Sequence, residues 1–259
     1  ANTISALAHL GFKTGFIGTV GNDEHGKMFE DDLNHAGIHV DLIRKEGDTG
    51  KILQVKTPDN AITTIGYPGV NANLAAEDLK DKYLSSYSHV IIDGYLMPNE
   101  EFAQTLMDSE NIQYMKVIFD LASSHIAEGY KEILKRFIKN SVDILFANDL
   151  EAFSYSGSEP EQAIRSMARD CEIVVIKKAD KGSLIQRGNE FYSIPAAPAD
   201  VLENTGAGDL YAAGFLYGLM KNYHLTHCGK IGAFLASKIL EVEGGRLPFD
   251  RWLEIKKMI

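Results

Sequence analysis

Apolar residues along this chain form short continuous runs that alternate with longer amphipathic stretches. The runs at 90–92, 117–119, 144–146 and 173–176 are bounded by polar turns. Continuous apolar runs are typical of parallel strands that are buried on both faces. The pattern predicts strands at 12–20, 89–93, 116–121, 142–147 and 172–177, and helices at 24–36, 99–111, 127–139, 160–169, 207–221, 226–241 and 249–257. It therefore indicates an α/β fold, with a doubly wound, mostly parallel sheet flanked by helices.

Two segments break the alternation. Extended stretches at 51–57 and 61–66 flank Pro58-Asp59-Asn60, and a second pair within 183–194 meets at Gly188-Asn189. Turn residues between two extended stretches predict a β-hairpin rather than a helical crossover. We therefore expect one α/β domain over 1–259 with an extended insertion around 40–70.

The chain begins within a helical pattern. Ala1-Asn2 leads directly into Ile4, Leu7 and Leu10, and Gly11 ends the helix. Because a domain rarely starts inside a helix, we expect a further N-terminal segment that is missing from this sequence.

Charge and composition restrict the classes of function. The formal net charge is −10 and no block of Lys and Arg is present, which argues against a nucleic-acid surface. No apolar run reaches membrane-spanning length, and no signal peptide is apparent. The two cysteines, Cys171 and Cys228, lie far apart, and the histidines form no zinc set. These features favour a cytoplasmic protein without a membrane or nucleic-acid partner.

The segment 203–209, Glu-Asn-Thr-Gly-Ala-Gly-Asp, opens an apolar helix and is the most informative motif. Small residues at Gly206, Ala207 and Gly208 leave backbone N–H groups open at a helix N-terminus, where an anion can bind. Asp209 then places a carboxylate beside that anion, which suits a base that accepts a proton from an attacking hydroxyl. A tight turn with a favourable first-turn acid would give the same local sequence.

Three other turns are candidates for binding. Asn148 and Glu151 follow a predicted strand and would share one helix face, either to address a metal-bound phosphate or to form a capping box. The turn at 177–182, with Lys181 and Gly182, would meet nucleotide phosphates or lie in solvent. The turn at 21–28 approaches a P-loop, but Met28 stands where Ser or Thr would bind Mg²⁺, so a helix N-terminus is expected there.

These motifs, in this order, resemble the PfkB family of carbohydrate kinases, the ribokinase and adenosine kinase group. The turn 206–209 is similar to the C-terminal motif of that family, Asn148-x-x-Glu151 to its Asn-x-x-Glu motif, and 2–26 to the end of its N-terminal motif. The segments 49–50, 57–59 and 93–96 look most like the adenosine-kinase-like branch.

The resemblance implies a ribokinase-like fold with a small β-sheet lid, and an ATP- and Mg²⁺-dependent kinase acting on a hydroxyl of a nucleoside or, second, of a ribose- or fructose-type sugar. It implies Asp209 as catalytic base, and the backbone of Gly206, Ala207 and Gly208 as anion hole. It further implies Asn148 and Glu151 as the Mg²⁺ and phosphate site, Lys181 and Gly182 on the nucleotide side, and Asn2 at the substrate. Residues 49–67 would belong to the lid, through which a homodimer would form.

Two departures from the family pattern leave alternatives open. Glu203-Asn204 stands where the family usually has Asp-Thr, whose Asp belongs to a monovalent-cation site in several members, so K⁺ activation stays open. The family's first strand is absent from the sequence. A catalytically impaired relative that binds nucleotide or sugar is therefore the alternative to an active kinase. A dinucleotide-dependent oxidoreductase is disfavoured, because no Gly-x-Gly-x-x-Gly follows an early strand.

Overall fold

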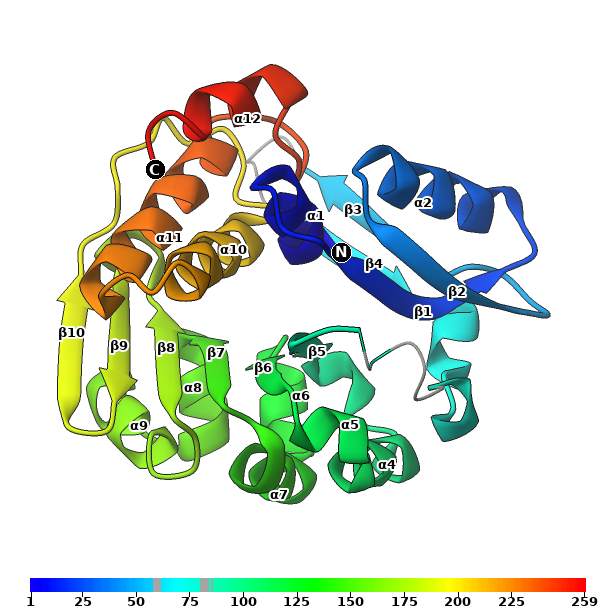
Figure 1. Ribbon diagram of the computed structural model, residues 1–259, viewed down its shortest axis with the longest axis horizontal. Helices are drawn as coiled ribbons and strands as arrows, with labels where there is room; N and C mark the ends of the chain where they lie inside the picture. The colour runs from blue at the N-terminus through cyan, green and yellow to red at the C-terminus, as the bar shows by residue number, and fades with distance from the viewer. Residues whose placement is uncertain (58–61, 80–83, 85) are drawn as a thin grey trace. The chain divides into compact units, whose positions relative to one another are not determined.

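The computed structural model describes residues 1–259 except 58–61, 80–83 and 85 (Figure 1). The chain divides into two compact units, one of residues 1 and 3–80 and one of residues 2 and 81–259.

A six-stranded sheet in the order β10-β9-β8-β7-β6-β5 forms the centre of the larger unit. Its four parallel strands are β5 (His89–Asp93), β6 (Lys116–Asp120), β7 (Ile144–Asn148) and β8 (Ile173–Lys177). The hairpin β9 (Ser183–Arg187) and β10 (Glu190–Ile194) continues the sheet in antiparallel fashion. The first four residues of both β7 and β8 are buried, as their continuous apolar sequences require.

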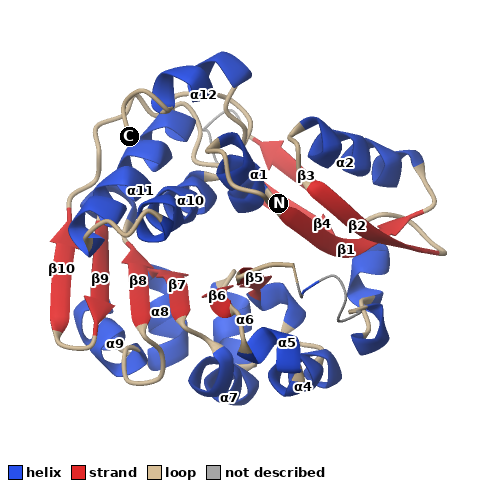
Figure 2. Cartoon of the chain, in the orientation of Figure 1, coloured by secondary structure: helices blue, strands red, loops and turns tan. Residues whose placement is uncertain are grey.

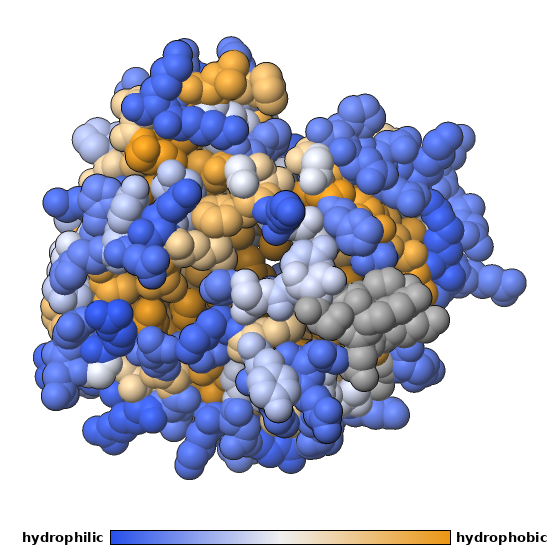
Figure 3. Space-filling view, in the orientation of Figure 1, coloured by the Kyte–Doolittle hydropathy of each residue, from blue (hydrophilic) through white to orange (hydrophobic). Residues whose placement is uncertain are grey.

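Helices cover both faces of this sheet (Figure 2). On one face, α9 contacts β8 and β9, and on the other, α11 contacts β9 and β10. Phe146 of β7 and Phe215 of α10 are both buried and meet edge to face, with ring centroids 5.6 Å apart. The outer helices along the lower rim of the view are mostly hydrophilic on their exposed side (Figure 3). The helices among the described residues of this unit are α4 (Glu100–Asp108), α5 (Glu110–Gln113), α6 (Ser124–Gly129), α7 (Lys131–Ser141), α8 (Asp149–Ser156), α9 (Pro160–Met167), α10 (Ala207–Met220), α11 (Leu225–Leu240) and α12 (Phe249–Ile255).

Two two-stranded sheets lie in the described part of the smaller unit. Strand β1 (Gly15–Gly21) pairs in parallel with β2 (His39–Lys45), and α2 (Glu24–His35) connects them. Strand β3 (Lys51–Lys56) pairs antiparallel with β4 (Ile62–Tyr67). The helix α1 (Asn2–His9) opens the chain, and the short helical turns η1 (Gly69–Asn73) and η2 (Ala76–Asp78) follow the hairpin.

The turn at 21–28 is a helix N-terminus, as the sequence predicts. Asp23 caps α2, and its carboxylate accepts a hydrogen bond from the Gly26 amide at 2.9 Å. A Cβ at Gly26 would lie 2.5 Å from the Gly21 carbonyl oxygen, so this position in the turn requires glycine.

Most predicted elements are confirmed, and the differences are local. Both hairpins form, although the turn at 58–60 lies outside the described residues. The predicted helix 99–111 is interrupted at Ser109, and the helix 127–139 begins earlier and is interrupted at Tyr130, which has a non-helical backbone. The strand predicted at 12–20 pairs with β2 in a sheet of its own, and β2 was not predicted as a strand.

A single domain with a lid around 40–70 stays a prediction, whereas the smaller compact unit begins at residue 1 and includes β1 and β2. Within the described part of the chain, no helix is long and apolar enough to cross a membrane. Both cysteines are free thiols.

Candidate functional site

Polar residues end all four parallel strands of the larger unit. Asp93 ends β5, Asp120 ends β6, Asn148 ends β7 and Lys177 ends β8. In the sheet register Asp93 lies opposite Asp120, and Asn148 lies opposite Lys177. The carboxyl ends of parallel strands share one edge of the sheet, where ligands bind in open α/β folds. The candidate site is therefore at this edge.

An ion pair crosses the middle of the site. Lys177 Nζ lies 2.9 Å from Asp120 Oδ2, and it reaches this oxygen across β7, 5.9 Å from the centre of the Phe146 ring. The other oxygen of Asp120 accepts a hydrogen bond from the Ala122 amide at 3.0 Å. Burial by itself would lower the pKa of the Lys177 ammonium, but nearby carboxylates, Asp120 foremost, outweigh it and raise that pKa. Lys177 is therefore a fixed cation.

Asn148 and Glu151 form a reciprocal capping box at the start of α8. The Asn148 side chain accepts from the Glu151 amide at 2.8 Å, and Glu151 accepts from the Asn148 amide at 2.8 Å. Glu151 is 5% exposed, and the pKa of its carboxyl is raised by desolvation first and by the Asp120 charge second. The capping box is thus confirmed, whereas the binding of Mg²⁺ and phosphate by these residues stays a prediction.

The turn before α10 has the geometry expected for an anion site. Gly206 is the N-cap with φ +81°, a left-handed conformation that favours glycine, and no side chain caps the helix. The first-turn N–H groups consequently have no partner within the helix. A Cβ at Gly208 would lie 3.3 Å from Lys177 Nζ, so the ammonium lies against this turn.

Asp209 lies in the first turn of α10, directly after the glycines. Its Oδ2 accepts a hydrogen bond at 2.9 Å from the Asn2 side-chain amide, and Asn2 groups with the larger unit. The structure thus brings into direct contact Asp209, which is predicted to be the base, and Asn2, which is predicted to contact the substrate.

The site is strongly acidic. Asp93 has a raised pKa, because it is desolvated and because Asp120 and Asp209 add negative charge. Its carboxylate also accepts a hydrogen bond from the Tyr95 amide at 2.9 Å, which starts the turn η3 (Gly94–Leu96). Carboxylates gathered in this way favour the binding of a cation beside them.

The turn with Lys181 and Gly182 is held by its own packing. It includes η4 (Ala179–Lys181), and Gly182 has φ +81°. A Cβ at Gly182 would lie 2.0 Å from the Ile194 carbonyl oxygen, so the position requires glycine for steric reasons alone. Lys181 is exposed. The placement of both residues on the nucleotide side stays a prediction.

Two residues of the site were not selected from the sequence. Within the turn 177–182 the sequence points to Lys181 and Gly182 rather than to Lys177, and it predicts Asp120 only as part of a strand. Both residues end parallel strands. A search of strand ends for charged side chains would have found them.

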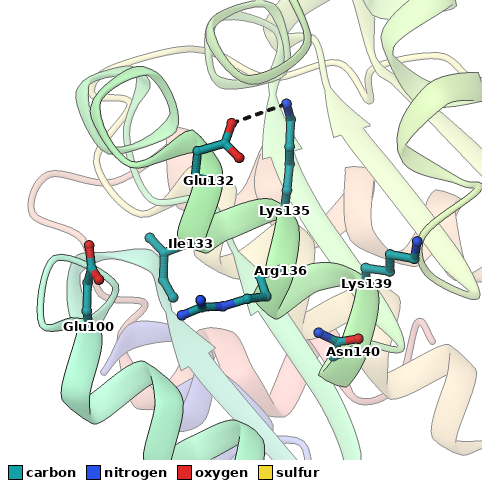
Figure 4. Close-up of a pocket in the computed structure, with 7 residues that line it drawn as sticks. All are labelled: Glu100, Glu132, Ile133, Lys135, Arg136, Lys139 and Asn140. Atoms are coloured by element: carbon teal, nitrogen blue, oxygen red, sulfur yellow. Dashed lines mark ion pairs between the residues drawn. The ribbon is translucent and has the colours of Figure 1, made fainter.

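A hollow elsewhere on the larger unit shares no residue with this site (Figure 4). It lies against α4 and α7, and an ion pair of 3.7 Å joins Lys135 to Glu132 at its rim. Its lining residues are Glu100, Glu132, Ile133, Lys135, Arg136, Lys139 and Asn140. Among the described residues, no group of three or more His, Cys, Asp or Glu side chains is arranged to hold a metal ion.

Comparison with known proteins agrees with this geometry. An uncharacterised sugar kinase from Archaeoglobus fulgidus is 28% identical over 252 residues, which cover 95% of this chain and 98% of that protein. A 5-dehydro-2-deoxygluconokinase from Geobacillus kaustophilus is 28% identical over 258 residues, covering 93% and 77%. The crystal structure of adenosine kinase from Sinorhizobium meliloti superimposes with a TM-score of 0.91 at 26% identity, covering 100% of this chain and 81% of that one.

The family model for pfkB family carbohydrate kinases matches residues 1–252. Kinases of this family use ATP, typically with Mg²⁺. The sheet of the larger unit and its helices are those of the ribokinase-like fold. The chain therefore belongs to the pfkB family of carbohydrate kinases, which are phosphotransferases with an alcohol group as acceptor.

Proposed function

We propose that this sugar kinase transfers the γ-phosphoryl group of ATP to a hydroxyl of a nucleoside of the adenosine type, with a ribose- or fructose-type sugar as second choice. The observation that carries the proposal is Asp209 in the first turn of α10, directly after the uncapped turn of Gly206, Ala207 and Gly208. The proposed base, Asp209, is therefore next to the proposed anion site at Gly206–Gly208. Similarity to an adenosine kinase structure supports the nucleoside.

Asp209 acts as the general base in this proposal. Its carboxylate accepts the proton of the acceptor hydroxyl while the hydroxyl oxygen bonds to the γ-phosphorus and the bridging bond to the β-phosphate breaks. The first-turn N–H groups at 206–208 and the positive end of the α10 dipole stabilise the charge on the transferred group. The Asn2 amide, 2.9 Å from Asp209 Oδ2, orients the base.

Mg²⁺ fits the chemistry of this site. Asp93 and Glu151 have raised pKa values from desolvation and from neighbouring carboxylates, so a divalent cation would relieve their repulsion. We propose that Asn148 and Glu151 would hold it at the carboxyl end of β7. When bound, Mg²⁺ neutralises phosphate charge.

Glu203-Asn204 is the position at which activation by K⁺ can be tested. Its carboxylate accepts a hydrogen bond from the Gly244 amide at 2.9 Å. If Glu203-Asn204 retains a monovalent-cation site, added K⁺ will raise turnover relative to a buffer that contains only large organic cations. A rate that is unchanged by K⁺ would show that this chain lacks the monovalent-cation activation implied by several members of the family.

A panel of acceptors tests the proposed activity. Mg-ATP and purified protein are incubated with adenosine and other nucleosides, ribose, fructose and 5-dehydro-2-deoxygluconate, the last because of the related kinase. We expect ADP release to be stimulated most by a nucleoside. Stimulation by a sugar or the sugar acid alone would replace the nucleoside assignment. Acceptor binding without ADP release would favour the impaired relative, the alternative raised by Glu203-Asn204.

We also propose a homodimer through the β3–β4 hairpin. In its register Leu53 lies opposite Ile65, and Val55 and Tyr67 share their face of the sheet. These four side chains are exposed by 60%, 56%, 43% and 53%, respectively, which is unusual for apolar residues in a two-stranded sheet. Sedimentation equilibrium should show a dimer that Leu53→Asp with Ile65→Asp converts to a monomer. A monomeric wild type would refute this proposal without affecting the activity.

The compartment is also proposed rather than shown. We infer a reducing cytoplasm, supported by the free thiols of Cys171 and Cys228. Labelling of both cysteines by a thiol reagent in unfolded protein taken directly from cells would support it.

A further inference from the structure

Lys177 is an enclosed cation whose hydrogen bonds are incomplete. Its side chain is 15% exposed, and an ammonium group has three N–H donors. One donor is used by Asp120 Oδ2 at 2.9 Å, and no second hydrogen bond joins Nζ to any other described residue. The two remaining donors are therefore available to a ligand.

The position of Nζ indicates which ligand this is. The ammonium lies against the turn of Gly206–Gly208, 3.3 Å from the place of a Gly208 Cβ. A side chain at Gly208 would therefore separate the ammonium from the turn. The carboxylates of Asp120, Glu151 and Asp209 all act on Lys177 and raise its pKa, so the group remains charged.

Without a cation, the negative charge of this site would repel the phosphates of ATP. The carboxylates of Asp93, Asp120, Glu151 and Asp209 belong to the larger unit and influence one another. A polyphosphate brought among these groups is repelled unless cations intervene. A fixed cation beside the anion turn reduces this repulsion at the point where charge spreads over the equatorial oxygens of the transferred group.

We infer that Lys177 is a further catalytic residue, whose two remaining N–H groups bind oxygens of the phosphoryl group during its transfer at the turn of Gly206–Gly208. The inference rests on the proposed kinase function. It predicts that Lys177 distinguishes ATP from ADP, because only ATP carries the group that the ammonium contacts. A lysine that served only as the partner of Asp120 would affect both nucleotides equally.

The test compares Lys177→Met and Lys177→Arg with Lys116→Met as the matched control. Lys116 lies at the opposite end of the same sheet and pairs with Asp143 at 2.7 Å and Glu172 at 2.9 Å, so its loss removes an ion-paired lysine away from the site. Titration calorimetry gives the dissociation constants of Mg-ATP and Mg-ADP, and steady-state kinetics gives kcat with the best acceptor.

We expect Lys177→Met to lower kcat roughly 10²–10³-fold, as the loss of a preorganised donor to a transition state does. The affinity of Lys177→Met for Mg-ATP should fall at least about tenfold more than its affinity for Mg-ADP. Lys177→Arg should recover part of the loss in kcat and part of the loss in Mg-ATP affinity. Lys116→Met should resemble wild type. An unchanged kcat, or equal loss of both nucleotides, would overturn the inference.

Additional variants and measurements cover the cases in which Lys177→Met does not fold or wild type shows no activity. If Lys177→Met does not fold because Asp120 is left unpaired, the double variant Lys177→Met with Asp120→Asn removes both charges, and the same ATP-to-ADP comparison applies. Asp120→Asn alone retains the ammonium and should retain the preference for ATP. If wild type phosphorylates no acceptor, the proposed function fails, while the nucleotide affinities still decide whether Lys177 binds the γ-phosphoryl group.

Discussion

Asn148 and Glu151 hold each other through three hydrogen bonds. Besides the two backbone bonds of the capping box, the Asn148 side-chain amide donates to Glu151 Oε1 at 2.7 Å. Both oxygens of the Glu151 carboxylate are therefore fixed in orientation. This pair ends β7 and begins α8, so a single interaction sets the helix N-terminus and presents an enclosed carboxylate to the site.

The enclosed charge of Glu151 should make stability depend on pH. Its pKa in the folded protein is raised above the ordinary value of 4.5, so the folded state holds this proton more tightly than the unfolded state. The contribution of Glu151 to the free energy of unfolding therefore falls as pH rises from about 4.5 through the raised pKa. Glu151→Gln removes this titration. We expect the stability of the variant, relative to wild type, to increase across that window in urea unfolding measured from pH 4 to 8.

A matched control separates this effect from general loss of charge. Glu132→Gln alters a carboxylate on α7 whose side chain is 93% exposed, and its difference from wild type should vary less with pH. A stability difference for Glu151→Gln that stays constant from pH 4 to 8 would show that burial does not perturb this carboxyl.

Asp209→Asn tests the proposed base. The amide keeps the size of the side chain and its Oδ1 can still accept from Asn2, but it cannot take a proton. We expect turnover to fall by roughly 10²–10⁴-fold with little change in the dissociation constant of Mg-ATP. Asp250→Asn is the control, since Asp250 also lies in a helix first turn, that of α12. Turnover retained by Asp209→Asn would exclude this residue as the base.

The sequence predicted the fold best where neighbouring residues alone determine an element of secondary structure. Continuous apolar runs located β5 to β8, and the turn pair Gly188-Asn189 located the hairpin of β9 and β10. Glycine followed by an apolar stretch located the start of α10. Each of these signals depends on residues that are neighbours along the chain, so no knowledge of tertiary packing was needed.

The remaining features depend on contacts between distant segments. The pairing of β1 with β2 in a separate sheet is set by long-range register and cannot be read from either strand. The ion pair of Lys177 with Asp120 joins residues 57 positions apart across an intervening strand. The helix breaks at Ser109 and Tyr130 could not be predicted, because the apolar periodicity of the sequence continues through them. Site residues that meet only in the folded chain were therefore the ones overlooked.

Two glycines with left-handed backbones should differ sharply when replaced by alanine. Gly188 has φ +55° and open space around a Cβ, so Gly188→Ala should cost about 1–2 kcal/mol of backbone strain. Gly182 has φ +81° and a Cβ there would lie 2.0 Å from the Ile194 carbonyl oxygen, so Gly182→Ala adds a steric clash with backbone. Urea unfolding should show a clearly larger loss for Gly182→Ala. Equal losses would mean that the turn relaxes to admit the methyl group.

Asp23 should stabilise the smaller unit with a pH dependence opposite to that of Glu151. Its carboxylate accepts hydrogen bonds from the Thr49 hydroxyl, the Thr49 amide at 3.0 Å and the Gly26 amide at 2.9 Å. These bonds, with the Thr49 hydroxyl foremost, hold the pKa of Asp23 well below its ordinary value of 3.8. The stabilisation is therefore present above pH 3.8 and is lost as pH falls toward the lowered pKa.

Acid unfolding followed by circular dichroism tests this dependence. Asp23→Asn should be less stable than wild type at pH 7, and the difference should shrink below about pH 3.8, where wild type loses the same charge. Thr49→Val should also destabilise the protein, because it leaves the buried Gly21 amide, 2.9 Å from the Thr49 hydroxyl, without its acceptor. Asp31→Asn, at an exposed position of α2, controls for the change in net charge. A stability difference between wild type and Asp23→Asn that grew on acidification would contradict the hydrogen-bonded carboxylate described for the start of α2.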